Sequence, residues 1–195
     1  MQCKRTVSRC FASLRQLRQI RYLVPTATLQ MLVVALVHSR LDYGNSVLVG
    51  LPAYLLCQLQ SVLNAAARLV YHLRARDHIT DALTSLDWLR APERMCTKRL
   101  FLTYKALHRG SPRHISSLVH VADVSGRPAL RSAGSNRLRI PSFKLSTIGG
   151  RAFPVASAQF WNWRHDNVTS VNSSSAFQPQ VEHILFQQSF PCIIT

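Results

Sequence analysis

The chain has 195 residues, of which 24 are Lys or Arg and 8 are Asp or Glu, so its formal net charge is +16. Because 47% of its residues are hydrophobic, it is too apolar for a disordered polybasic tail, which cannot bury enough surface to offset chain entropy. It lacks the apolar stretch of a secretory signal, and its longest apolar run, residues 31–37, is far below the roughly 18 residues that cross a bilayer. We therefore expect an intracellular protein, nuclear or cytoplasmic, that is not secreted and not membrane-bound.

Five cysteines are scattered through the chain without a CxxC pair. An odd number of separated cysteines, in a chain without an export signal, is typical of reduced thiols in an intracellular protein. The sequence therefore predicts buried, reduced thiols at positions 3, 10, 57, 96 and 192.

Two helices are predicted in the first quarter of the chain. Apolar residues recur at three- and four-residue steps over residues 6–23, which indicates an amphipathic helix. Pro25 ends this helix, because proline disfavours a helical residue before it. The second helix is expected from Thr26 to Gly44, or at the latest to the turn at 50–52, and its expected apolar face consists of Leu29, Leu32, Val33, Leu36 and Val37.

Three further helices are predicted before residue 110. The clearest spans residues 55–73, where alanines at 65–67 would let another helix approach closely, and its apolar face consists of Leu55, Leu59, Val62, Ala66, Leu69 and Leu73. A short helix is expected from Asp77 or His78 to Leu86, with Asp77 as a cap. The last begins near Pro92, a residue tolerated in the first turn, and stops at Gly110.

From Val121 the helical periodicity is lost, and Gly and Pro residues interrupt a basic stretch of sequence. Basic and apolar side chains alternate over residues 137–140, which favours a short strand there. We therefore expect this basic stretch to form a loop or a β-hairpin. Helical periodicity returns over 151–161 and 175–186, with Ser175 as the expected N-cap and Pro179 in or just after the first turn. We predict a mainly α fold, a helical bundle with a basic, loop-rich insertion and C-terminal helices, divided into a helical lobe at 1–120, the loop or hairpin at 121–150 and a helical segment at 151–195.

The basic residues gather where acids are missing. No Asp or Glu occurs before Asp42 or between Asp123 and Asp166. On the helix predicted after Pro92, bases recur at intervals that place them on one stripe together with Phe101. Such a stripe suits a phosphate backbone with occasional base contact. The candidate nucleic-acid-binding residues are Arg94, Lys98, Lys105 and Arg109, with Arg131, Arg137 and Arg139 as a second set.

A basic helix face has plainer explanations, namely a solvated surface or a codon bias that favours Arg over Lys. Three basic regions around an apolar core favour RNA or DNA as the partner, since guanidinium groups make bidentate phosphate contacts without a sequence-specific motif. A membrane surface is the weaker interpretation, because no broad apolar face opposes the basic stripe.

Patterns that support catalysis are missing from the sequence. Its acids are mostly isolated and form no Asp-Asp pair of the kind that two-metal enzymes need. Histidines at 108, 114 and 120 are spaced six residues apart and do not share a helix face. No phosphate-binding loop, GxSxG or GxGxxG motif occurs. We therefore expect no enzymatic activity, metal, cofactor or small-molecule substrate.

Several short phrases occur in an order that is specific to one family. They are SRLDYGNS at 39–46, GLP at 50–52, LQSVLNAAARLV at 59–70, RDHIT at 76–80, LDWL at 86–89, YKALH at 104–108, LRS at 130–132, RAF at 151–153 and FWN at 160–162. Over about residues 6–186 the chain resembles the region that follows the polymerase domain in reverse transcriptases of jockey-type non-LTR (LINE) retrotransposons.

The resemblance implies a helical, thumb-like region that holds template RNA or target DNA. Members of the family are RNA-directed DNA polymerases whose catalytic aspartates lie in a palm domain, which is expected to precede this region. None of those residues can be assigned here, so the resemblance implies a fragment that lacks the palm and the endonuclease. Two alternatives remain open: an interaction module that docks on the missing polymerase domain, or the product of a decayed element without function.

Two of these phrases also have structural interpretations. Asp42 is the first acid in the chain and has seven bases before it, so we expect it to pair with Arg40 or Arg68 and to fix helix packing. Trp88 and Trp161 lie among apolar residues and are expected to anchor the core rather than stack on bases.

Overall fold

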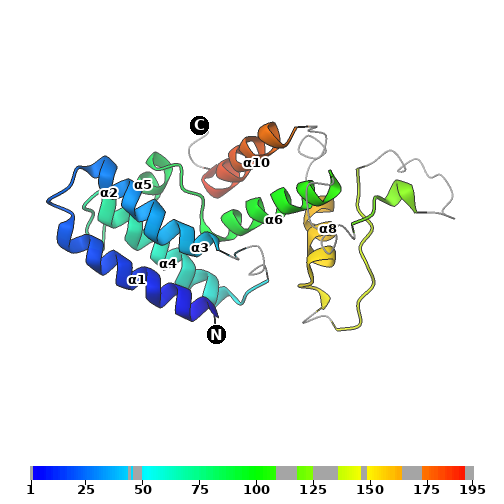
Figure 1. Ribbon diagram of the computed structural model, residues 1–195, viewed down its shortest axis with the longest axis horizontal. Helices are drawn as coiled ribbons and strands as arrows, with labels where there is room; N and C mark the ends of the chain where they lie inside the picture. The colour runs from blue at the N-terminus through cyan, green and yellow to red at the C-terminus, as the bar shows by residue number, and fades with distance from the viewer. Residues whose placement is uncertain are drawn as a thin grey trace. The chain divides into compact units, whose positions relative to one another are not determined.

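A computed structural model (Figure 1) describes residues 2–43, 45, 50–108, 118–124, 136–145, 149–163 and 173–191. The chain forms two compact units: Met1–Met95 with Leu185–Thr195, and Cys96–Ile184. The predicted mainly α fold is confirmed. The predicted boundaries at residues 120 and 150 stay predictions, while the boundaries of the compact units fall inside two helices.

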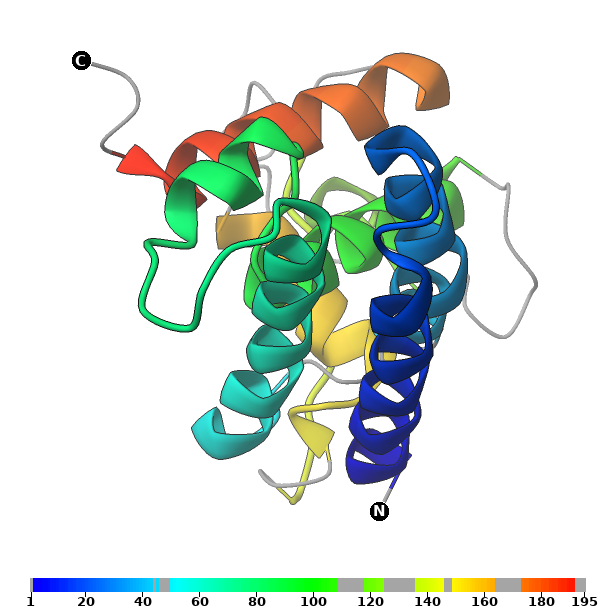
Figure 2. The same cartoon turned by 90° about the vertical axis from the view of Figure 1, so that its left-hand side faces the viewer.

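The first unit is built from helices that pack side by side. α1 lies along α4, and the rod formed by α2, η1 and α3 packs on α1 and, through α2, on α4 (Figures 1 and 2). The elements are α1 (Gln2–Ile20), α2 (Thr26–Val33), the π-helical η1 (Val34–His38), α3 (Ser39–Asp42), α4 (Ala53–Val70) and α5 (Thr80–Ser85).

The core of this unit follows the predicted apolar faces closely. Leu14 and Leu17 of α1 are buried in the same cluster as Leu59 and Val62 of α4, and burial of each large apolar side chain contributes about 1.5–3 kcal/mol. The alanines at 66 and 67 are fully buried, as expected for the close approach of another helix. α1 begins four residues earlier than predicted.

The rod departs from a regular α-helix. Its buried residues Leu29, Val33, Val37 and Leu41 repeat every four residues, a longer step than the 3.6 residues of an α-turn. The π-turn at Val34–His38 widens the helix and accommodates this repeat. As a result Leu36, predicted to be on the apolar face, is 37% exposed.

Two helix ends in this unit have a left-handed residue after the last turn. His72 follows α4 and Asp87 follows α5, each with φ of 54°. The next residue closes each end: Leu73 N–H donates to the Arg68 carbonyl and Trp88 N–H to the Leu83 carbonyl, as in a Schellman cap. Asp77, predicted to cap α5, instead accepts a hydrogen bond from the Arg74 backbone N–H at 2.6 Å, because α5 begins only at Thr80.

The second unit contains the C-terminal part of α6 (Ala91–Leu107), the 3-10 turn η3 (Val121–Asp123), α8 (Phe153–Trp163) and most of α10 (Ser174–Ser189). Pro92 lies in the first turn of α6, as predicted. Ser175 lies inside α10 rather than at its N-cap, and Pro179 falls in the second turn. Of the alternatives predicted around residues 137–140, the strand is not formed: the segment makes an isolated antiparallel bridge between His120 and Leu138, and no strand occurs in the described residues.

Aromatic rings form the centre of the second unit. The Phe177 ring stacks on Tyr104 at 4.3 Å and on Trp161 at 6.0 Å between centroids. Trp161 and, in the first unit, Trp88 are buried, which confirms the prediction that both belong to the core.

The cysteines agree only in part with the prediction. Cys3 and Cys10 are buried, Cys96 is half-buried and Cys57 is exposed, and no disulfide joins these four. Burial raises the pKa of the Cys10 thiol. Cys57 is exposed because it lies on α4 opposite the buried Leu59, and Cys192 lies outside the described residues.

Candidate nucleic-acid interface

Arg137 and Arg139 extend from a segment whose backbone is held on both edges. Arg139 N–H donates to the Val119 carbonyl and Val121 N–H donates to the Arg137 carbonyl, each at 2.9 Å. Between the two arginines, Leu138 is buried with 1% of its surface exposed. Side chains alternate in an extended segment, so the arginines lie on the opposite side from Leu138, and both are exposed.

The other edge of this segment is held by α8. Asn162 Nδ2 donates to the Leu138 carbonyl at 2.8 Å, and Leu138 N–H donates to Asn162 Oδ1 at 2.7 Å. The indole N–H of Trp161 donates to the Asn136 carbonyl at 2.8 Å. Two residues of the FWN phrase therefore take the place of a neighbouring strand. Because Leu138 is buried, its N–H and carbonyl would lose hydrogen-bond partners without Asn162, at a cost of about 1–3 kcal/mol for a buried group.

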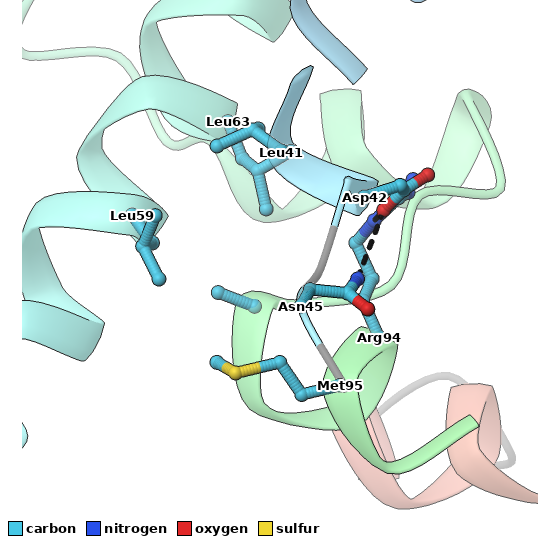
Figure 3. Close-up of a pocket in the computed structure, with 8 residues that line it drawn as sticks. Leu41, Asp42, Asn45, Leu59, Leu63, Arg94 and Met95 are labelled. Carbon is cyan, nitrogen blue, oxygen red and sulfur yellow. Dashed lines mark hydrogen bonds and ion pairs between the residues drawn. The ribbon is translucent and has the colours of Figure 1, made fainter. Parts of the chain in front are cut away.

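Arg94, the first residue of the predicted α6 stripe, is engaged in the first unit (Figure 3). Its Nη2 lies 2.7 Å from Asp42 Oδ2, and its Nε donates to Asp42 Oδ1 at 3.2 Å, a bidentate pair. Asn45 Nδ2 also donates to Asp42 Oδ1, at 3.1 Å. The expectation that Asp42 pairs with Arg40 or Arg68 is wrong, because residues distant in sequence supply its partner. Arg40 instead donates to Ser13 Oγ.

The surroundings of this pair are apolar. Leu41, Leu59, Leu63 and Met95 line a small pocket beside it, with room for little more than a water molecule (Figure 3). The Arg94 and Asp42 side chains are 19% and 33% exposed. A half-buried bidentate pair over a nearly filled pocket joins α3 to α6 and leaves no space for a substrate.

His38 lies in the same region of the first unit. Its ring is buried against Trp88, with 4.0 Å between centroids. Burial and, to a smaller extent, the Arg94 charge lower the pKa of His38 to about 3, while the Asp42 charge acts in the opposite direction. The side chain is therefore neutral at physiological pH.

The remaining predicted residues fall in the second unit or outside the described chain. Lys98 is exposed on α6. Lys105 is half-buried, with Nζ 4.5 Å from the Phe101 ring centroid, a cation–π contact. Arg99, between them in sequence, is 1% exposed, and burial lowers its pKa. Arg109 and Arg131 lie outside the described residues.

α1 carries a basic surface that the candidate set omitted. The helix contains no Asp or Glu, and its basic side chains are exposed; they are Lys4, Arg5, Arg9, Arg15 and Arg18. The acid-free sequence before Asp42 carried this signal. The regular spacing of bases on α6 was a weaker signal, because spacing along a helix does not show which bases find a carboxylate in the folded protein.

The described residues contain no group of three His, Cys, Asp or Glu side chains that could hold a metal ion. Within the same residues, no helix is both long and apolar enough to cross a membrane. No protein-family model, curated protein or solved structure matches the chain.

Proposed function

We propose that this chain is the helical region that follows the polymerase domain of a jockey-type non-LTR reverse transcriptase, and that it binds RNA or DNA without sequence specificity and without catalysis. The observation that carries the proposal is the presentation of Arg137 and Arg139: both side chains are exposed while Leu138 is buried and Asn162 holds the backbone. Because the backbone that carries them is held, less freedom is lost when these planar guanidinium groups bind phosphates.

The exposed bases of α1, together with Lys98 and Lys105 of α6, supply further phosphate contacts in this proposal. Arg94 is left out, because its guanidinium already makes a bidentate contact with Asp42. Contacts of this kind position a nucleic acid backbone and read no sequence.

Filter binding of the whole chain to RNA and DNA over a series of salt concentrations tests the proposal. Release of counterions should make the logarithm of the affinity fall linearly with the logarithm of salt, with a slope of about −0.7 (single strands) to −0.9 (duplex) per phosphate contacted. Undetectable binding, or binding independent of salt, would contradict it. Primer extension by this chain is expected to give no product.

One observation favours a second function, docking on a polymerase domain. Met31 and Val34 are 64% and 42% exposed and lie one turn apart on α2 and η1, and neighbouring exposed apolar side chains are typical of a surface that contacts another protein. If they face a partner, a jockey-type palm domain expressed with this chain should co-purify with it, and Met31→Glu should abolish the association. Co-purification that Met31→Glu leaves intact, or none with the wild type, would contradict docking at this surface.

A further inference from the structure

Two aromatic rings stack at the surface of the first unit. Tyr22 lies in the turn after α1 and His72 in the turn after α4. Their ring centroids are 5.5 Å apart and their planes differ by 12°. Tyr22 nevertheless keeps 76% of its surface exposed, and His72 is also exposed. The stacked pair therefore lies at the surface, and most of the Tyr22 side chain is open to solvent.

His72 occupies a position where glycine would be easier to accommodate. Its φ of 54° is the left-handed conformation of the Schellman position, in which glycine is the usual residue because it has no Cβ. In this protein the position instead carries an imidazole that stacks on Tyr22. Helix termination alone does not require an aromatic side chain at this place.

The charge around the pair is positive. The Arg21 guanidinium lies over the Tyr22 ring, 4.4 Å from its centroid, and donates to the Tyr22 hydroxyl. Arg18 precedes it by one turn of α1, and Arg74 and Arg76 follow His72 and are exposed. The acid in this loop, Asp77, accepts the backbone N–H of Arg74.

The C-terminal ends of α1 and α4 limit the kind of chemical group that can bind against the rings. The C-termini of α1 and α4 carry partial negative charge, which disfavours an isolated anion against the rings themselves. A neutral, planar group that is covalently linked to phosphates satisfies both features: it stacks on Tyr22 and His72 while the surrounding arginines contact the phosphates. A nucleotide base in a single strand has this chemistry, and base stacking on aromatic side chains is common in single-strand binding.

We propose that Tyr22 and His72 form a stacking site for an unpaired base of single-stranded RNA or DNA. The inference rests on the proposed function and extends it. It predicts that the chain binds a single strand that carries bases more tightly than a backbone of the same charge without bases. Arg21 orients the Tyr22 ring, and Arg18, Arg74 and Arg76 contact the flanking phosphates.

Fluorescence anisotropy of the whole chain with labelled oligouridylate and oligothymidylate tests the proposal, with abasic oligonucleotides of equal length and charge in parallel. Wild type should bind the base-containing strands more tightly than the abasic ones. Tyr22→Ala should weaken binding to base-containing strands roughly 5- to 100-fold and leave abasic binding unchanged. Tyr22→Phe keeps the aromatic ring and should weaken binding much less than Tyr22→Ala.

His72→Gly separates stacking from folding. Glycine adopts the left-handed conformation without a steric penalty, so the Tm of this variant should be equal to or above that of the wild type while base-dependent binding falls. Tyr54→Ala is the matched control, because Tyr54 is 59% exposed at the other end of α4; it should change neither Tm nor affinity.

Each outcome decides between the proposals. Equal effects of Tyr22→Ala on uridylate and thymidylate assign the site to both polymers, and an effect on one assigns it to that polymer. Binding that Tyr22→Ala leaves unchanged, as expected for a site that instead contacts a protein, overturns the stacking site but not the proposed function. So does an equal loss on abasic strands. Absence of binding by wild type to any of these strands overturns both.

Discussion

Arg94 on α6 and the Arg137–Arg139 pair were predicted to bind the same ligand, yet the protein surrounds them differently. Arg94 makes a bidentate contact with Asp42 and is half-buried. Arg137 and Arg139 are exposed on either side of a buried leucine. The comparison shows that the role of a basic residue depends on whether folding brings a carboxylate to it, which helical spacing cannot reveal.

The largest loss of stability is expected from a substitution of Leu138, the buried residue between the exposed Arg137 and Arg139. Leu138→Ala removes a fully buried side chain and should lower the free energy of unfolding of the second unit by about 2–5 kcal/mol. Chemical denaturation monitored by tryptophan fluorescence measures this, since Trp161 lies in the same unit. Leu145→Ala is the control: Leu145 is 62% exposed, and the change should stay within about 0.5 kcal/mol. Equal costs for the two variants would show that Leu138 is no anchor.

Removal of Arg94 should affect stability rather than binding. Arg94→Met leaves the half-buried Asp42 without its bidentate partner and should cost about 2–3 kcal/mol, between the values for exposed and buried pairs. Arg76→Met, at an exposed arginine in a loop, should cost less than about 0.5 kcal/mol. A double-mutant cycle with Asp42→Asn isolates the pair, and a coupling energy near zero would argue against it.

His38 makes the stability of the first unit depend on pH. Its folded-state pKa of about 3 lies below the ordinary value near 6.5, so the unfolded chain binds the proton more tightly. Stability is therefore fully present above pH 6.5 and decreases as pH falls towards 3, by roughly 2 kcal/mol at pH 5. Denaturation at pH 7 and pH 5 should show this loss in wild type and in His78→Gln, an exposed histidine, but not in His38→Gln. Identical pH dependence in all three would contradict it.

Much of the fold could be predicted from the sequence, because its helices have clear apolar periods and proline or glycine boundaries. The faces of α1 and α4 and the start of α6 at Pro92 are examples. The π-turn could not be predicted, since a four-residue repeat of apolar side chains is also compatible with a slowly rotating α-helical face. Leu36 was misplaced for that reason.

The candidate site was predicted less well because its chemistry depends on tertiary contacts. The alternation at 137–140 indicated a strand, but the partner on one edge is the Asn162 side chain rather than a second strand. The pairing of Asp42 with Arg94 joins residues 52 positions apart. The stacking of Tyr22 on His72 joins two turns, and neither turn has a periodic pattern that would reveal it.

The smallest expected effect on stability belongs to the exposed arginines, and their effect on binding tests the account most directly. Arg137→Gln combined with Arg139→Gln should leave the free energy of unfolding within about 0.5 kcal/mol of wild type. In a salt titration of single-stranded RNA binding, the double variant should lower the magnitude of the log–log slope by about 1.4, or about 0.7 for each phosphate that the variant no longer binds. Arg94→Met, measured where it is fully folded, should leave the slope unchanged. An unchanged slope in the double variant together with a reduced slope in Arg94→Met would contradict the assignment of binding to the exposed pair.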